Sequence, residues 1–147
     1  MSIGVKAANP AFEAVVRDSF AKQGLMGTYG AWLVSIAPGA VTIEVPHNKR
    51  LTQQQGFFHG GVASAIGDAA GAYAALSLMP AASDVSTVEY KINFMRPAVG
   101  PLLRAVGQVI RSGKTLSVVR VDVLCGQADA LEACAVIQAT FIRVEID

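Results

Sequence analysis

Cysteine and histidine are scarce in this sequence of 147 residues, and each occurs only twice. Cys125 and Cys134 have neither the number nor the spacing of a disulfide framework or a zinc site. We therefore expect no bound metal and two buried, inert thiols, which suits a reducing cytoplasm. His47 and His59 occur without a G-x-S-x-G segment, so a hydrolase of the α/β-hydrolase type is unsupported. We interpret His47, at a strand end, as a surface loop residue.

Charge is also sparse and balanced. Charged residues make up 16% of the chain and the formal net charge is +1, which gives no electrostatic argument for nucleic acid or a membrane as partner. The N-terminal segment has no apolar core followed by a small-residue cleavage site, so we expect no signal peptide. The longest apolar run, 62–79, is interrupted by Asp68, which favours a core helix over a membrane span. We expect a cytoplasmic protein.

The order of the predicted elements indicates the fold class. The length suits a single domain, 1–147, without repeats or linkers. Apolar spacing between Asn9-Pro10 and Gly24 predicts an N-terminal helix over about 10–23, and an alanine-rich stretch predicts a long central helix. That helix covers 60–78, and the predicted strands cover 31–37, 40–46, 85–95, 102–111, 115–124 and 132–145. Short connections between the last three favour antiparallel pairing, so we predict an α+β fold with one antiparallel sheet of about six strands.

The central helix has an unusual run of small residues. Residues 67–72, GDAAGA, are all small, although glycine in a helix interior costs roughly 1 kcal/mol relative to alanine. Such a segment makes sense where another element packs very close to the helix backbone on several sides. We expect a curved sheet that wraps around this helix.

Asp68 is the single carboxylate of this helix. Burying an unpaired ionised carboxylate costs several kcal/mol, and no basic residue lies three or four positions away on the helix. Asp68 therefore faces solvent, pairs with a Lys or Arg, or has a chemical role. The helix start at His59-Gly60-Gly61 favours the chemical role, because free N–H groups at a helix N-terminus form a ready oxyanion hole for acyl transfer.

Gly60 and Asp68 are eight positions apart, which is roughly 12 Å along a helix axis. One acyl carbonyl cannot easily contact the Gly60 amide and be attacked beside Asp68 of the same helix. Two antiparallel copies of the helix about a two-fold axis would bring Gly60 of one chain against Asp68 of the other. If both residues belong to one site, that site needs a homo-oligomer.

Several of these motifs occur together in a known family. Gln53, the segment HGGVASAIGD at 59–68, the strand end INFMRP at 92–97 and the GKT turn at 113–115 resemble the hotdog-fold acyl-CoA thioesterases of the PaaI-like, phenylacetate-degradation type. The resemblance covers about 30–144. It implies a long helix wrapped by an antiparallel sheet and paired into dimers or tetramers. It also implies hydrolysis of an acyl-CoA to the free acid and CoA, with no cofactor, because coenzyme A is part of the substrate.

The resemblance further implies a role for each matching residue. Asp68 matches the family's catalytic carboxylate, which acts as general base on water or as nucleophile. Gly60 matches the glycine whose N–H polarises the thioester carbonyl. His59 matches the neighbouring histidine, which positions the substrate or assists the thiolate. Gln53 falls where relatives carry Asn or Gln near the substrate and the attacking water.

Two further candidate residues, Thr87 and Ser86, lie farther along the chain than the HGGVASAIGD segment. Thr87 falls where some relatives place a Ser or Thr that orients water, and Ser86 is its competitor because the alignment crosses a loop of variable length. Gly61, beside the oxyanion donor, and Ser86 are counted with the substrate-binding residues.

Three basic residues are considered for the phosphates of coenzyme A. Arg96, in NFMRP, and Arg111 and Lys114, around the RSGK turn, lie in loops near where relatives hold the nucleotide. Ordinary surface charge is the alternative for all three. SGKT is not a P-loop, because the preceding glycine is missing and a strand follows.

Other functions stay open. An acyl-thioester dehydratase or hydratase on the same fold typically pairs a catalytic His with an acidic residue in different surroundings. A non-catalytic acyl-CoA sensor would carry a DNA-binding segment, for which the roughly 25 residues before the first strand leave no room. The sequence does not identify the acyl group, so aryl-acetyl, hydroxybenzoyl-like and medium-chain acyl groups are all candidates. The residues that could line an acyl tunnel suit a plain core equally well, and they are Phe57, Phe58, Tyr73, Leu76 and Met79.

Overall fold

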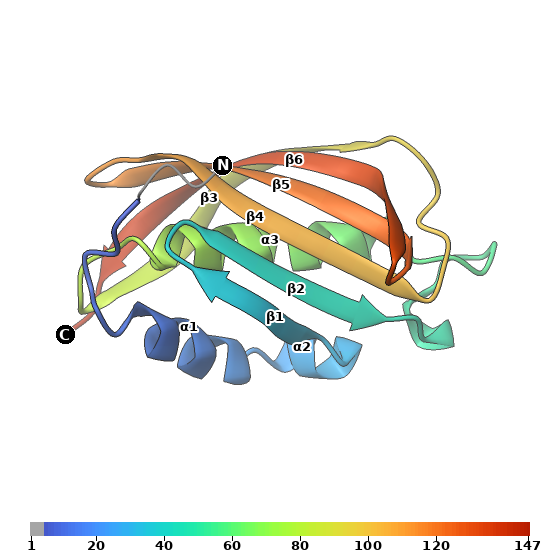
Figure 1. The fold of residues 1–147 in the computed structure, drawn as a ribbon, viewed down its shortest axis with the longest axis horizontal. Coiled ribbons are helices and arrows are strands. Elements are labelled where there is room, and N and C mark those ends of the chain that lie inside the picture. The colour runs from blue at the N-terminus through green and yellow to red at the C-terminus, as the bar shows by residue number, and fades with distance from the viewer. Residues whose placement is uncertain (1–4) are drawn as a thin grey trace.

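The computed structural model describes residues 5–147, in which a curved six-stranded sheet wraps over one long helix (Figure 1). The elements are α1 Phe12–Ala21, α2 Gly24–Tyr29, β1 Trp32–Ala37, β2 Ala40–Pro46, a 3-10 turn η1 Lys49–Leu51, α3 Gly60–Leu76, β3 Ser83–Phe94, β4 Leu102–Ser112, β5 Leu116–Gln127 and β6 Ala130–Glu145. Helices α1 and α2 run beside β1 (Figure 1). This is the α+β hotdog arrangement that the sequence predicted.

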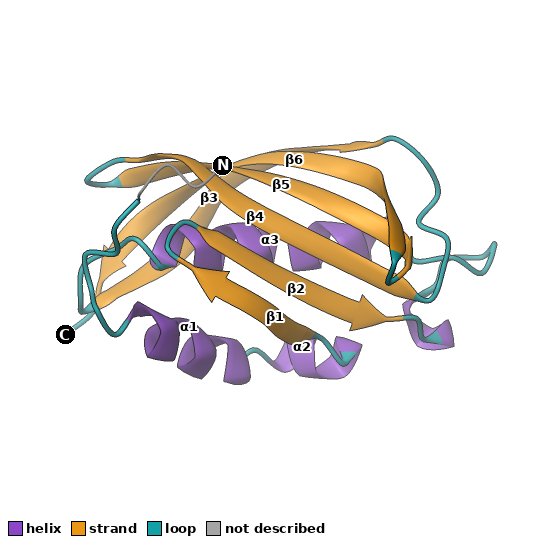
Figure 2. Ribbon diagram, in the orientation of Figure 1, coloured by secondary structure: helices purple, strands orange, loops and turns teal. Residues whose placement is uncertain are grey.

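All neighbouring strands in the sheet are antiparallel, in the order β1-β2-β4-β5-β6-β3 (Figure 2). Strands β4, β5 and β6 form consecutive hairpins, as their short connections predicted. Strand β3 comes before this group in the chain but pairs with β6, with Thr87 opposite Phe141. Within one chain, the sheet therefore has β1 and β3 as its edge strands.

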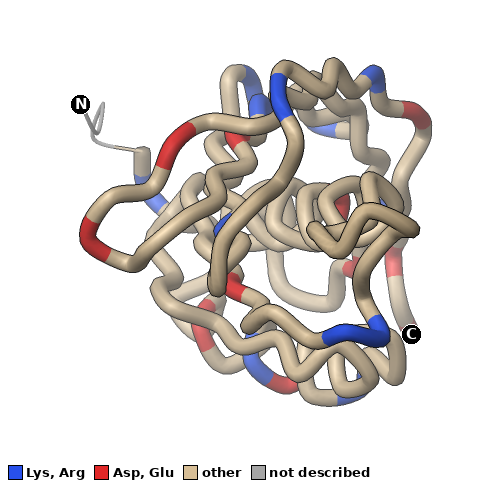
Figure 3. The backbone as a smooth tube through the Cα atoms, turned by 90° about the vertical axis from the view of Figure 1, so that its right-hand side faces the viewer, with Lys and Arg blue, Asp and Glu red and all other residues tan. Residues whose placement is uncertain are grey.

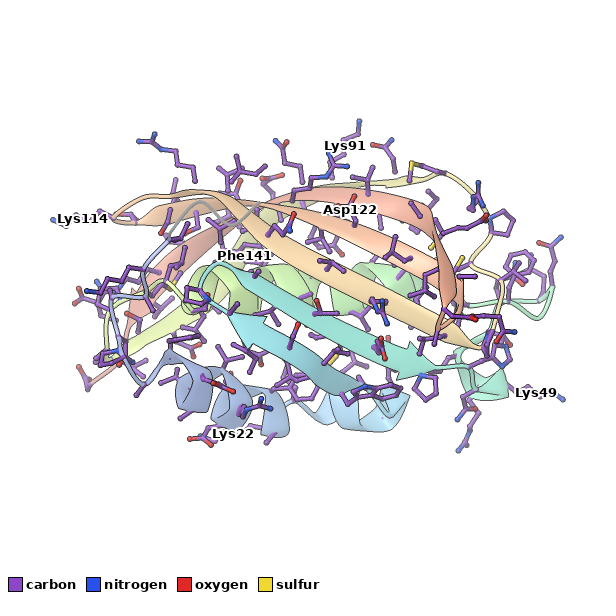
Figure 4. The ribbon with its side chains drawn as sticks, viewed as in Figure 1. Lys22, Lys49, Lys91, Lys114, Asp122 and Phe141 are labelled. Atoms are coloured by element: carbon purple, nitrogen blue, oxygen red, sulfur yellow. The ribbon has the colours of Figure 1, made fainter. Side chains whose placement is uncertain are left out.

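The concave face of the sheet lies so close to α3 that glycine is needed at the contacts. A Cβ on Gly67 would overlap Cδ1 of Ile137, and a Cβ on Gly71 would lie 3.1 Å from the ring of Phe141. Phe141, labelled in Figure 4, lies between the sheet and the helix. The small residues of this helix thus permit the close wrapping that the sequence predicted.

Gly107 on β4 meets the helix backbone itself, and Gly107→Ala is expected to destabilise the protein. A Cβ there would lie 2.6 Å from the carbonyl oxygen of Ala70, and a backbone atom cannot move aside as a side chain does. Overpacking of this kind lowers the free energy of unfolding by about 1–3 kcal/mol. Urea unfolding measures the loss, with Gly27→Ala as the control because open space surrounds Gly27. Wild-type stability in Gly107→Ala would contradict the close contact.

The N-terminal helical region differs from the single helix predicted over 10–23. The structure has two helices there, and Gly24, expected to stop the first, begins the second. Helix α2 is held by the buried side chain of Met26 and is followed by a cap residue, Gly30, which has a left-handed backbone with φ of 67°. The segment GLMGTY contains two glycines and no amphipathic repeat, so its sequence carries no helical signal. Tertiary packing decides its conformation.

The remaining elements lie close to their predicted ranges. Helix α3 ends at Leu76, slightly before the predicted end, while β3 begins at Ser83 and β5 continues to Gln127, slightly outside the predicted ranges. The turn η1, capped by the side chain of Asn48, was not predicted. No helix within residues 5–147 is long and apolar enough to cross a membrane.

Candidate active site

His59 caps the N-terminus of α3 and leaves one backbone donor free. Its Nδ1 accepts a hydrogen bond from the Gly61 amide at 2.7 Å, and its carbonyl oxygen accepts one from the Val62 amide at 2.9 Å. Within residues 5–147, the Gly60 amide has no acceptor. Gly60 therefore presents a free N–H at the positive end of the helix dipole, which suits an oxyanion.

Gly60 lines a cleft of about 380 Å³ between α3, the loop before it and the end of β3, here called the Gly60 cleft. Apolar side chains, among them Phe94 and Met95, form most of its walls. The ring of Phe94 lies against Gly60, where a Cβ would come within 3.1 Å of it. Gln53 lines the same cleft, so the structure brings these two predicted site residues together.

The side chain of Gln53 is held by its own loop. Its Nε2 donates to Oε1 of Gln55 at 3.0 Å, and its Oε1 accepts from the Gln55 amide. His47 supports this loop, because its Nε2 lies 3.1 Å from the carbonyl oxygen of Gly56 and its ring packs edge-on against Phe58. His47 is exposed, as predicted, and lies outside the Gly60 cleft. The loop is thus a structured wall of the cleft.

Asp68 is half-buried on α3 and has its hydrogen-bond partner on β3. Oγ1 of Thr87 donates a hydrogen bond to Oδ1 of Asp68 at 2.7 Å. Burial raises the pKa of Asp68 above the ordinary aspartate value of 3.8, and the hydrogen bond from Thr87 lowers it by less. No Lys or Arg within residues 5–147 forms an ion pair with Asp68. Neither full exposure to solvent nor pairing with a cation describes this carboxylate.

Strand alternation decides which of the two predicted hydroxyl residues reaches Asp68. Thr87 faces α3 with its register partner Phe141, whereas Ser86 precedes it and points to the opposite face of the sheet. A bulge follows, because the register shifts between Thr87 and Glu89. The structure therefore brings Thr87, and not Ser86, to Asp68.

Asp68 and Thr87 open into a second cleft of about 320 Å³, here called the Asp68 cleft, between α3, β3 and the connection from α1 to α2. The Asp68 cleft and the Gly60 cleft share no lining residue in the described part of the chain. Roughly 12 Å of helix separates Gly60 from Asp68, so one chain does not bring them together. Strand β3 borders both clefts, with Phe94 in one and Thr87 in the other.

The three basic residues considered for the phosphates of coenzyme A do not lie close together within one chain. Arg96, at the Gly60 cleft, forms an exposed ion pair with Glu132. Arg111 and Lys114 are exposed at the other end of β4, where Lys114 projects from the end of the sheet in Figure 4. Figure 3 shows charges of both signs interspersed along the chain.

The two cysteines are free and buried, as predicted. Burial, with Cys125 close by, raises the pKa of Cys134 to about 12, so this thiol stays protonated and unreactive at neutral pH. Cys134 contributes to the Gly60 cleft as an apolar wall. Within residues 5–147, no three His, Cys, Asp or Glu side chains are grouped as ligands for a metal ion.

Sequence reasoning missed the residues that α1 and the following turn bring to the Asp68 cleft. Ser19 and Gln23 line it together with Tyr73, which follows them by 54 and 50 positions. No motif marks Ser19 or Gln23, because only the docking of α1 beside α3 places them there. Phe94 was also missed as a site residue, although it lies within the INFMRP segment.

Comparison with known families and solved structures identifies proteins that are similar to this chain in sequence and in fold. A family model described as the thioesterase superfamily matches residues 55–131, which include α3 and β3. A thioesterase family protein from Silicibacter pomeroyi, known from its crystal structure, is 38% identical to this chain. The two superpose with a TM-score of 0.89 over 91% of this chain and 98% of the other.

Two further proteins are similar to this chain, one in sequence and one in fold. Human acyl-coenzyme A thioesterase 13 is 35% identical over 91 residues, which are 61% of this chain and 64% of the human protein. The Escherichia coli PaaI protein from the phenylacetic acid degradation operon superposes with a TM-score of 0.83 over 96% of this chain and 100% of that chain. At 18% identity, the second likeness shows the fold alone.

Proposed function

Because this chain belongs to the thioesterase superfamily and is a thioester hydrolase, we propose that it hydrolyses an acyl-CoA to the free acid and coenzyme A. One observation carries the proposal. The half-buried Asp68 carboxylate, hydrogen-bonded by Thr87, lies on the same helix as the free Gly60 amide, and the two open into different clefts. Each chain thus offers a base in one cleft and an oxyanion donor in the other.

In the proposed reaction, the ionised Asp68 carboxylate takes a proton from a water molecule, whose oxygen attacks the thioester carbonyl carbon. The carbonyl oxygen becomes an oxyanion and accepts a hydrogen bond from the Gly60 amide. The C–S bond of the tetrahedral intermediate then breaks, and the coenzyme A thiolate takes up the proton held by Asp68. A second route has the carboxylate itself attack the carbonyl and expel the coenzyme A thiolate, which gives a mixed anhydride. Water then opens the anhydride to the free acid and the Asp68 carboxylate, and the proton that this releases is taken up by the thiolate.

Three neighbours are proposed to support this chemistry. Thr87 orients the Asp68 carboxylate through its hydrogen bond. His59 fixes the first turn of α3, and so the direction of the Gly60 N–H, by capping the helix. Gln53 lines the Gly60 cleft and would contact the substrate or the attacking water once its side chain leaves its own loop. A thioester has a good leaving group, so one base and one or two donors suffice.

We propose that β3 strands of two chains pair across a two-fold axis and complete the site. Strand β3 is a twelve-residue edge strand with exposed apolar side chains, because Val88 is 53% exposed and Phe94 is 56% exposed. An unpaired, partly apolar edge is a template for another strand. Antiparallel pairing would set the Phe94 end of one β3 beside the Thr87 region of the other, which joins the two kinds of cleft. The expected state is a homo-oligomer, a dimer or a tetramer.

The remaining proposals concern coenzyme A and the location of the protein. We propose that Arg96, Arg111 and Lys114 bind the phosphates of coenzyme A, with contributions from two chains, because exposed guanidinium and ammonium groups suit phosphate. The Gly61 amide donates to Nδ1 of His59, so Gly61 is proposed to help fix the helix start beside the substrate. Ser86 points to the face of the sheet opposite Asp68, so any contact that it makes with the substrate would be on that face. Two free buried thiols support a cytoplasmic location.

Release of free thiol from acyl-CoA esters tests the proposed function. A panel of short-chain, medium-chain and aryl-acetyl CoA esters is assayed beside the matching N-acetylcysteamine thioesters, which lack the nucleotide. We expect turnover with a lower KM for the CoA esters. Hydration or dehydration of an acyl chain without thiol release would identify a dehydratase instead. Binding of every ester without turnover would identify a sensor.

Thr87→Val is expected to move the acid limb of the pH profile of kcat/KM to higher pH. Burial raises the pKa of Asp68 and the Thr87 hydroxyl lowers it, so the variant removes only the lowering contribution at nearly constant volume. Asp68 acts as a base only when ionised, and activity therefore falls as the pH drops through its pKa. Thr87→Ser keeps a hydroxyl and is the control. If the acid limb did not move in Thr87→Val, the ionisation of Asp68 would not be what sets that limb.

A further inference from the structure

The Asp68 cleft has a second polar region besides the carboxylate. Tyr73 is 2% exposed, and its hydroxyl lies among side chains brought by α1 and the turn after it. Gln23 Nε2 donates a hydrogen bond to Oη of Tyr73 at 2.6 Å, and Oγ of Ser19 lies 3.1 Å from the same atom. All three residues line the Asp68 cleft. We call them the Ser19–Gln23–Tyr73 cluster.

One face of α3 connects the carboxylate to this cluster. Ala65, Asp68, Ala69, Ala72 and Tyr73 line the cleft at the spacing of a single helix face. Asp68 and Tyr73 are five positions apart, which is about 7.5 Å along the helix axis. Alanine supplies the surface between them, so an acyl group has room to lie along the helix with its thioester beside Asp68. Its far end would then reach the cluster.

The cluster has unused hydrogen-bonding capacity. The amide nitrogen of Gln23 is bonded to Tyr73, while its Oε1 has no donor within residues 5–147. An amide oxygen accepts hydrogen bonds and donates none, so it selects a ligand hydroxyl over a methyl group. Asp84 also lines this cleft, and the two carboxylates disfavour an anionic end group. The chemistry of the far end therefore suits a neutral hydroxyl.

We propose that the Ser19–Gln23–Tyr73 cluster is the far end of the acyl-binding pocket and that Gln23 selects acyl groups with a hydroxyl at that end. This inference rests on the proposed thioesterase function. The cleft volume, about 320 Å³, lies at the small end of the range for ligand pockets, roughly 300–1,000 Å³. Ser19 and Gln23 lie outside residues 55–131, the segment that matches the family model. Gln23, the proposed selecting residue, is therefore supplied by a part of the chain separate from the proposed chemistry.

Three CoA esters of one length test this inference. Hexanoyl-CoA, omega-hydroxyhexanoyl-CoA and adipoyl-CoA all have six-carbon acyl groups and differ only in whether the last carbon is a methyl, a hydroxymethyl or a carboxylate. An extended hexanoyl chain with a terminal hydroxyl bridges the span from Asp68 to Tyr73. We expect wild-type kcat/KM to be highest for the hydroxy ester, by about threefold to tenfold over hexanoyl-CoA, which is what one neutral hydrogen bond contributes.

Gln23→Leu is expected to remove this preference, so that the ratio of kcat/KM for the hydroxy ester to kcat/KM for hexanoyl-CoA falls to about one. Tyr73→Phe is the second variant, because it keeps the ring and removes the hydroxyl that holds Gln23. Lys22→Leu is the control, since Lys22 neighbours Gln23 but points away from the body of the protein in Figure 4. Thermal melting confirms that each variant is folded.

The outcomes separate the two proposals. The role of the cluster would be overturned if folded Gln23→Leu and Tyr73→Phe kept the preference for the hydroxy ester. It would also be overturned if the wild type preferred adipoyl-CoA or hexanoyl-CoA. In both cases, thiol release would still support the thioesterase. Absence of thiol release from all three esters and from the wider panel would overturn both. Loss of the preference in both variants, with the preference intact in Lys22→Leu, supports the inference.

Discussion

Asp68→Asn is expected to lower kcat/KM for acyl-CoA hydrolysis by about 100-fold to 10,000-fold, the usual contribution of a general base. Asparagine has nearly the same shape, and its Oδ1 can still accept the hydrogen bond from Thr87, so the geometry of the Asp68 cleft is kept. The amide can neither take a proton from water nor attack the carbonyl. Thiol release under single-turnover conditions measures the loss. Asp18→Asn is the control, because Asp18 is exposed on α1.

The same variant separates catalysis from stability. Burial raises the pKa of Asp68 in the folded protein, so the ionised carboxylate is less favourable in the folded state than in the unfolded state. The stability that protonated Asp68 contributes is present below the unfolded pKa and is lost as the pH rises through the folded pKa. Asp68→Asn should therefore be at least as stable as wild type at neutral pH, with an advantage that shrinks on acidification. Turnover close to wild type would remove the proposed role.

Gly60→Pro is expected to lower kcat by about 100-fold to 1,000-fold, because it removes the proposed oxyanion donor. Proline is well tolerated at the first position of a helix, and the Gly60 N–H has no helical acceptor to lose. His59, the preceding residue, has φ of −63° and ψ of 138°, the extended backbone that proline favours before it. The substitution therefore removes one N–H and leaves the helix start in place.

Gly60→Ala is the matched control for this prediction. Both substitutions add a Cβ that would lie 3.1 Å from the ring of Phe94, and that exposed ring can move aside. Only proline removes the donor. A large loss of kcat in both variants would assign the effect to crowding of the Gly60 cleft and not to the N–H group.

Mixing the two inactive variants tests whether the site is shared. A mixed dimer of Asp68→Asn and Gly60→Pro chains has one site with both lesions and one site with neither, if Gly60 and Asp68 act across chains. With random pairing, half of the dimers are mixed, and each mixed dimer has one intact site of two. About a quarter of all sites would then be intact, and activity would return to about a quarter of the wild-type level. Activity that stays at the level of the separate variants would show that each chain works alone.

The sequence was most informative where residue size and spacing are themselves the constraint. The run of small residues at 67–72 predicted close wrapping by a sheet, and the contacts of Gly67 and Gly71 with β6 confirm it. The eight positions between Gly60 and Asp68 predicted that one chain cannot bring them together, and the two separate clefts agree with that prediction. These inferences need only helix geometry and side-chain volume.

Other features depend on tertiary contacts that no local pattern encodes. The choice between Ser86 and Thr87 follows from the register of β3 on β6, which a bulge shifts nearby. Gly24 starts a helix because Met26 finds a buried position, not because the local sequence favours one. Gln23 reaches Tyr73 only after α1 docks beside α3. The pairing of strands and the docking of helices that are distant in sequence decide these features, and the spacing of residues along the chain does not reveal them.

The docking of α1 beside α3 has a consequence for how this protein can change over generations. In the proposed enzyme, bond cleavage depends on α3 and β3, whereas recognition of the acyl end depends on α1 and the turn that follows it. Substitutions in the N-terminal helices can therefore redirect the enzyme to a new ester while the hydrolytic machinery stays as it is. Substrate preference and turnover are then separate traits, open to independent selection.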